Sequence, residues 1–150
     1  MLVESRLTYY VYCVTLTVVE NQNSKKEIRM PFVTMRYKRS RVTSSFVDML
    51  AHELPRIIAP HLSLGGRERN EGLVTPDDIM VQCEEGGPYD VNTKDIQISI
   101  LAHDFPERVV NLESRKEAIL EGIRAVMTHY GAKASGCVLI TLHHMAYGKL

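Results

Sequence analysis

The order of the predicted elements in this chain repeats once, and the repeat restricts the folds available to it. Four segments have the alternating or continuous apolar pattern of β-strands: residues 32–38, 79–83, 96–103 and 137–142. Two segments have apolar residues at helical spacing: residues 45–60 and 112–130. From Pro31 onward the chain therefore runs strand, helix, strand, and then the same order again, in repeat units of about 31–85 and 96–150.

The ends of the two predicted helices carry their own signals. Ser45 and Asp48 have the spacing of a capping box, and Pro55 predicts a kink inside the first helix. In the second helix, we expect Asn111 to cap the first turn and Gly131 to end the last one. Both segments are therefore predicted as amphipathic helices with one face toward a core.

Two such units predict a four-stranded sheet with both helices on one face, an α/β (α+β) fold. Right-handed crossovers make the two strands of each unit parallel. The nearly continuous apolar run at 137–142 predicts a strand that is covered on both faces or central in the sheet, and residues 104–110 are predicted as a loop. The sheet face away from the helices also carries apolar residues, so we expect a cyclic homo-oligomer to bury it.

Charge and cysteine content exclude some functions. The 150 residues contain 18 Lys+Arg and 18 Asp+Glu, so the chain lacks the excess positive charge with which a broad nucleic-acid-binding face holds phosphates. Cys13, Cys83 and Cys137 are odd in number and form no CxxC pair, which indicates reduced thiols in a cytoplasmic protein. His143 and His144 are adjacent and would face opposite sides of a strand. We therefore expect no metal, no cofactor, no nucleic acid and no membrane partner.

The first thirty residues differ from the rest. Residues 7–19 are rich in β-branched and aromatic side chains, which suits an extra strand but is too short to span a membrane. Codons for Lys-Lys-Glu at 25–27 can spell a ribosome-binding sequence shortly before Met30. Our hypothesis is that translation starts at Met30, that residues 1–29 are an N-terminal extension or mis-assigned leader, and that residues 30–150 form one domain.

Short motifs in this order resemble those of the tautomerase superfamily, which includes 4-oxalocrotonate tautomerase, macrophage migration inhibitory factor and 5-carboxymethyl-2-hydroxymuconate isomerase. The motifs are Met-Pro at 30–31 before the first strand, Arg41 ten positions after the proline, Asn-Leu-Glu-Ser-Arg at 111–115 and His-Met-Ala-Tyr-Gly at 144–148. The resemblance covers Pro31 to the end of the chain. It implies the two-unit fold described above and a homotrimer.

The resemblance also implies a reaction. If Met30 is removed, the nitrogen of Pro31 becomes a secondary amine that can accept a proton, and burial beside cationic side chains brings the pKa of an α-amino group toward neutrality. Pro31 would then be the general base of a cofactor-independent tautomerase or isomerase. Its substrate would be a small enolisable 2-oxo acid or an unsaturated carboxylate.

Three further residues are candidates for substrate binding. Arg41 matches a substrate-binding arginine of the family, and a guanidinium can hold a carboxylate through two parallel hydrogen bonds. Arg108 occupies the corresponding loop of the second unit, and Tyr89 offers a hydroxyl donor. The arginine that the oxalocrotonate branch carries in its second strand has no counterpart at 78–82. Three basic residues near Arg41 are alternatives to it: Arg36, Lys38 and Arg39.

Other interpretations of Pro31 stay open. Proline is tolerated at the first residue of a strand for purely structural reasons. The chain would then be a non-catalytic oligomeric binding protein on the same fold. A related decarboxylase or hydratase would instead use a protonated Pro31 as an acid, and the pH profile of activity separates an acid from a base.

Overall fold

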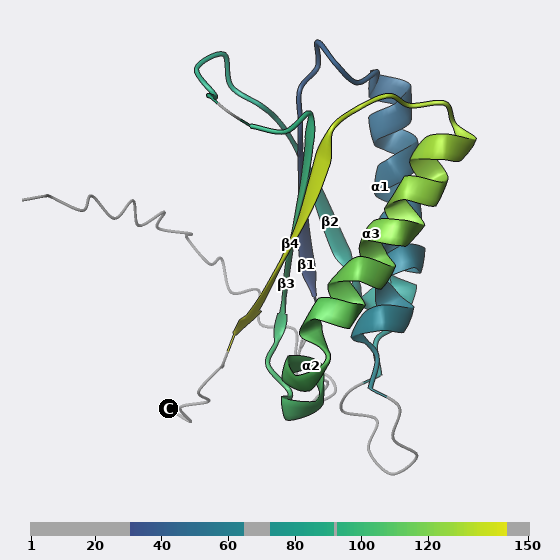
Figure 1. Cartoon of the computed structure of the whole chain (residues 1–150), viewed down its shortest axis with the longest axis vertical. Helices are drawn as coiled ribbons and strands as arrows, with labels where there is room; N and C mark the ends of the chain where they lie inside the picture. The colour runs from purple at the N-terminus through teal and green to yellow at the C-terminus, as the bar shows by residue number, and fades with distance from the viewer. Residues whose placement is uncertain (1–30, 65–72, 92, 144–150) are drawn as a thin grey trace, which may run out of the picture.

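The computed structural model describes residues 31–64, 73–91 and 93–143 (Figure 1). The hypotheses about Met30, the leader and residues 144–148 lie outside the described residues. Along the chain the elements are β1 (Phe32–Tyr37), α1 (Ser44–Leu62), the 3-10 helix η2 (Pro76–Asp78), β2 (Met80–Glu85), β3 (Ile96–His103), α2 (Pro106–Val110), α3 (Leu112–His129) and β4 (Gly136–His143). Within the described residues, no helix is long and apolar enough to cross a membrane.

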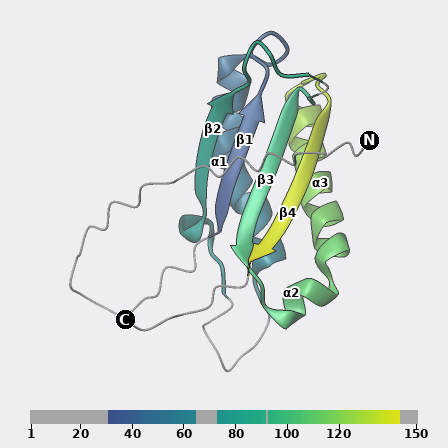
Figure 2. The same ribbon diagram turned by 90° about the vertical axis from the view of Figure 1, so that its left-hand side faces the viewer.

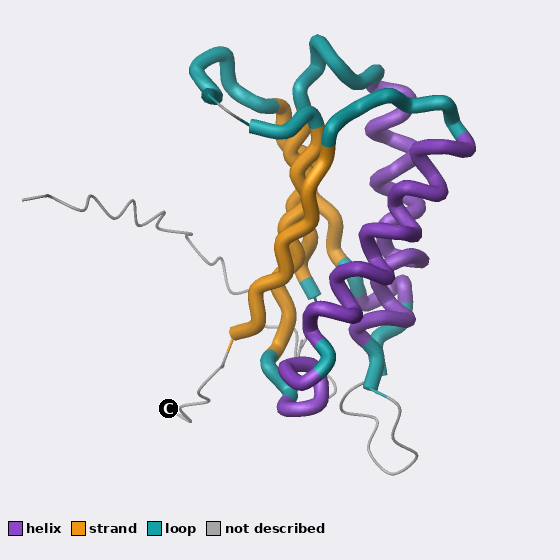
Figure 3. Tube along the Cα trace, in the orientation of Figure 1, coloured by secondary structure: helices purple, strands orange, loops and turns teal. Residues whose placement is uncertain are grey.

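The four strands form one mixed sheet in the order β2-β1-β3-β4. β1 pairs in parallel with β2, and β3 pairs in parallel with β4, while β1 and β3 are antiparallel. α1 and α3 both lie against the same face of the sheet (Figures 1 and 3). The predicted two-unit α+β fold is therefore confirmed, including the parallel pairing inside each unit.

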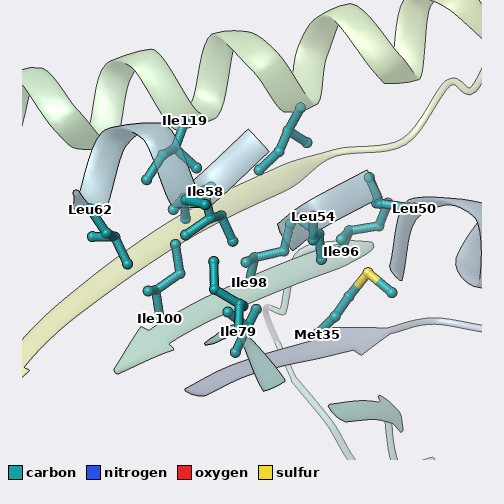
Figure 4. Packing of buried hydrophobic residues seen from close by; sticks show 14 of the residues in the cluster. Met35, Leu50, Leu54, Ile58, Leu62, Ile79, Ile96, Ile98, Ile100 and Ile119 are labelled. Atoms are coloured by element: carbon teal, nitrogen blue, oxygen red, sulfur yellow. The ribbon is translucent and has the colours of Figure 1, made fainter. Parts of the chain in front are cut away.

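The core lies between the sheet and the two long helices (Figure 4). Alternate residues of β1 and β3 point into it, and the side chains of Met35, Ile98 and Ile100 are at most 1% exposed. α1 and α3 approach closely at Gly122, where an added Cβ would lie 2.8 Å from Cγ2 of Ile57. The apolar stripes of the helices supply the other half of the core: Leu50, Leu54, Ile58, Leu62, Ile119 and Ile123.

The helix ends differ from the predictions at three places. Asn111 does precede α3, but its side chain makes no capping hydrogen bond. α1 is capped by Thr43, whose hydroxyl accepts a hydrogen bond from the Phe46 backbone N–H, so the box at Ser45 and Asp48 is not used. The segment 104–110, predicted as loop, contains the short helix α2, which Pro106 opens with its fixed backbone angle. Gly131 does follow α3 with a positive φ of 66°, as predicted.

The last strand was predicted to be central in the sheet or covered on both faces, and in the single chain it is neither. β4 is an edge strand that pairs with β3, and only Val138 of its residues is buried. The apolar run therefore does not indicate a central strand. Leu139, one of its residues, lies on the sheet face away from the helices and is half-exposed. The sheet face that carries Leu139 is uncovered in the single chain (Figure 2).

Candidate active site at the Pro31 end of the sheet

The antiparallel pairing of β1 and β3 decides which candidate residues meet. Phe32, the first residue of β1, pairs with Leu101 near the end of β3 and with Met80 at the start of β2. Residues that precede β1 therefore lie beside residues that follow β3. We call this the Pro31 end of the sheet, formed by Pro31, the start of β2, the end of β3 and α2.

Pro31 is held at the head of a central strand. Its side chain is fully buried, and its carbonyl accepts a hydrogen bond of 3.2 Å from the Met80 backbone N–H. β1 has neighbours on both sides, β2 and β3, so the position of the proline is fixed by two strand pairings. A general base needs such a fixed position relative to its substrate.

Arg108 lies at the same end and is 2% exposed. Its Nε donates to the carbonyl of Leu62 at 2.8 Å, and its Nη1 donates to the carbonyl of His103 at 2.9 Å. The guanidinium also lies 4.8 Å from the ring centre of Phe105. Burial, with the neighbouring charge of Arg115, lowers the pKa of Arg108 to about 10, so the group stays charged at neutral pH.

A second arginine reaches the same place from α3. Arg115 donates through Nη1 to the carbonyl of His61 and, at 3.4 Å, to that of Ser63. Both guanidinium groups thus bind carbonyls at the carboxyl end of α1, where helix carbonyls lack intrahelical partners and the helix dipole is negative. Two arginines of the second repeat unit therefore bind the carboxyl end of α1, the helix of the first unit. They also bring two positive charges to the Pro31 end.

Arg41 lies at the opposite end of β1. The strand between it and Pro31 has six residues, which span roughly 20 Å. Nε of Arg41 lies 3.5 Å from Oδ1 of Asp95, and its side chain is 64% exposed. This ion pair leaves much of the guanidinium open to solvent.

Tyr89 belongs to the same end as Arg41. It lies in the turn that follows β2, where the Asp90 carboxylate accepts from the Gly87 backbone N–H at 2.9 Å and pairs with Arg36. The Tyr89 side chain is 92% exposed. Within one chain, the structure therefore brings Pro31 together with Arg108, and Arg41 together with Tyr89, but it does not join the two pairs.

Two residues at the Pro31 end, Arg115 and His103, were not predicted as site residues from the sequence, and His103 is the less expected of them. This last residue of β3 has its Nδ1 3.4 Å from Oδ1 of Asp104, and its ring stacks on Phe105 with centroids 4.7 Å apart. The available signal was a histidine followed by an aspartate where a strand ends. Only the strand pairing shows that this place is next to Pro31. Among the described residues, no group of His, Cys, Asp and Glu side chains is arranged to hold a metal.

Comparison with known proteins shows the fold. No family model and no curated protein matches the sequence. The structure is similar to that of a 5-carboxymethyl-2-hydroxymuconate delta-isomerase, with a TM-score of 0.54 and 10% identity over 82% of this chain and 89% of that one. It is also similar to a protein of unknown function from Vibrio cholerae O1 biovar eltor, with a TM-score of 0.50 and 13% identity over 92% and 96%.

The fold that the resemblance implied is thus shared with a solved 5-carboxymethyl-2-hydroxymuconate delta-isomerase. A 5-carboxymethyl-2-hydroxymuconate isomerase from Deinococcus radiodurans R1 is also among the similar structures, with a TM-score of 0.49, 10% identity, and coverage of 77% of this chain and 82% of that one. At these identities the comparison carries the architecture alone. The chemistry has to be argued from the residues at the Pro31 end.

Proposed function

We propose that the protein is a cofactor-independent tautomerase or isomerase in which the amine of Pro31 is the general base. The observation that carries the proposal is the place of Pro31, buried at the head of a central strand and at the same end of the sheet as the two arginines that bind the carboxyl end of α1. The shared fold with an enzyme described as a delta-isomerase supports it. The substrate is a small enolisable 2-oxo acid or an unsaturated carboxylate.

The reaction needs a neutral amine and nearby positive charge. Loss of Met30 turns the Pro31 nitrogen into a secondary amine, which takes a proton from the carbon next to the substrate carbonyl. Negative charge then develops on the carbonyl oxygen, and the charges of Arg108 and Arg115 at the same end of the sheet stabilise it. That Arg108 also contacts the substrate carboxylate stays a prediction, because the hydrogen bonds described for it are to backbone carbonyls.

The proposal includes a homo-oligomer, with a trimer as its expected form. Arg41 and Tyr89 lie too far from Pro31 to act on the same small substrate within one chain. A second copy that covers the outer sheet face can bring its own Arg41 end to the Pro31 end of the first copy. The outer face carries half-exposed apolar side chains suited to such burial: Met80, Leu101 and Leu139.

Kinetics of a Pro31→Ala variant test the proposal. Protein purified from its native host is assayed with phenylpyruvate, a 2-oxo acid whose enol absorbs ultraviolet light. We expect kcat/KM for ketonisation to fall at least about tenfold, because alanine leaves an amine without the ring that fixes its lone pair.

Pro55→Ala is the matched control. Pro55 lies within α1 and away from the helix end that Arg108 and Arg115 bind, and its replacement should leave kcat/KM within about twofold of wild type. Equal activity of Pro31→Ala and the wild type would overturn the proposal. A rate of enolisation that rises with pH in the wild type is expected of a neutral amine acting as base, whereas the acid mechanism of a decarboxylase or hydratase requires the opposite.

A further inference from the structure

The register of β1 and β3 places His103 close to Pro31. It is two residues beyond Leu101, the partner of Phe32, and it faces the outer side of the sheet as Leu101 does. With neighbouring strands about 4.8 Å apart and a rise of about 3.3 Å per residue, its Cα lies roughly 6 Å from that of Pro31. The Pro31 ring is buried on the helix side, like the Val33 side chain, so a substrate touches both residues by lying across the end of the sheet, against the Pro31 nitrogen and the His103 ring.

Two contacts position the imidazole of His103, and a third holds its backbone. Its Nδ1 faces the Asp104 carboxylate at 3.4 Å, and its ring is stacked on Phe105. Its backbone carbonyl accepts a hydrogen bond from Arg108. The side chain is 14% exposed, so it is largely enclosed yet still reaches the surface.

This arrangement sets which nitrogen can meet a substrate. A carboxylate beside Nδ1 favours the proton on that atom, which leaves Nε2 as the nitrogen that donates to, or accepts from, a ligand. The charged and titratable groups around it are Asp104, Arg108 and, across the strand pair on β4, His143. The Arg108 nitrogens described above already bind backbone carbonyls, so His103 is the better placed donor to a substrate oxygen.

We propose that His103 is a second catalytic residue, the acid that works opposite Pro31, and this inference rests on the proposed function. As Pro31 takes the proton from carbon, the electrons of the C–H bond form the C=C bond. The π electrons of the carbonyl move to its oxygen, which takes the Nε2 proton of His103 in its imidazolium form, while the Nδ1 proton stays beside Asp104. The products are the enol, protonated Pro31 and neutral His103. Ketonisation runs the same steps in reverse, so each group regains its starting state.

A His103→Ala variant tests the role, again with phenylpyruvate and protein from the native host. General acid catalysis contributes about 10²- to 10⁴-fold, so kcat should fall by about 100-fold or more while KM stays within about threefold. Added imidazole should restore at least about tenfold of the lost rate, because it can occupy the space beside Phe105. A residue needed only for structure would not respond to imidazole.

His143→Ala is the matched control, since it removes the neighbouring exposed imidazole and keeps the backbone carbonyl that accepts from Asp104 N–H. It should keep kcat within about twofold. If His103→Ala does not fold, His103→Gln replaces it, with the same loss of kcat expected.

Two outcomes separate this inference from the proposed function. A His103 variant with at least half the wild-type kcat, while Pro31→Ala is impaired, overturns the inference and leaves the proposed function standing. Equal activity of Pro31→Ala and the wild type overturns the proposed function, and the inference falls with it.

Discussion

Arg108 shows how far a residue's role can be derived from sequence position. The internal repeat placed this arginine in the loop that corresponds to Arg41, and the structure puts it at the same end of the sheet as Pro31. The repeat did not reveal that its side chain is buried and binds carbonyls of Leu62 and His103. That fact depends on where α1 ends relative to α2, which follows from packing between units rather than from any local pattern.

Replacement of Arg108 by Met should destabilise the fold. The change removes the donors to two buried carbonyls, and breaking buried charged hydrogen bonds costs about 2–4 kcal/mol. Urea denaturation measures the free energy of unfolding. Arg41→Met is the control and should change it by less than about 1 kcal/mol, because Arg41 forms only an exposed ion pair. Unaltered stability of Arg108→Met would show that the carbonyl contacts contribute nothing to the fold.

At the scale of elements, periodicity predicted all four strands and both long helices to within a few residues. Their ends were less predictable, because several polar residues near 43–48 could each cap α1 and only Thr43 does so. The edge position of β4 was missed because apolar content does not distinguish burial inside a chain from burial against a second copy. The pairing of β1 with β3, which creates the candidate site, came from no local signal.

The start of β3 depends on one carboxylate. Asp95 accepts hydrogen bonds from the backbone N–H and the hydroxyl of Ser135, at 2.8 and 3.0 Å, which ties β3 to the loop before β4. The backbone hydrogen bond from Ser135, helped by its hydroxyl and by the charges of Arg41 and Lys38, holds the pKa of Asp95 below its ordinary value. The folded state therefore favours the ionised carboxylate.

The difference in the free energy of unfolding between wild type and an Asp95→Asn variant should therefore depend on pH. Because the folded pKa is lowered, the stabilisation is fully present above the unfolded pKa of about 3.9 and is lost as pH falls through the folded value. At pH 7 the variant should be about 1–2 kcal/mol less stable in urea, since charged hydrogen bonds are stronger than neutral ones. The difference should shrink below about pH 4. A gap that is independent of pH would contradict this assignment.

At the scale of the whole molecule, the single chain leaves one sheet face uncovered and separates Arg41 and Tyr89 from Pro31. Both facts have the same explanation in the proposed oligomer, in which one copy covers the outer face of the next. The sequence supported the expectation of an oligomer through its apolar outer residues. It could not show that the four candidate residues divide between the two ends of the sheet, because that division follows from strand direction.

A charge placed on the outer face should dissociate the oligomer. Leu139→Glu lies in the middle of β4 on that face, and its side chain is 50% exposed in the single chain, so the monomer should tolerate it. Sedimentation velocity should show an oligomer for the wild type and a monomer for the variant, with ketonisation lost alongside. Tyr130→Glu, an exposed change at the far end of α3, should leave the oligomer intact. A monomeric wild type would contradict the oligomer.

The intact mass of the protein from its native host shows whether the nitrogen of Pro31 is a free amine, as the proposed base requires. We expect a mass that corresponds to a chain beginning at Pro31. A mass that includes Met30, or that corresponds to a chain beginning at Met1, would make this nitrogen an amide. An amide cannot act as the base, so that result would contradict the account.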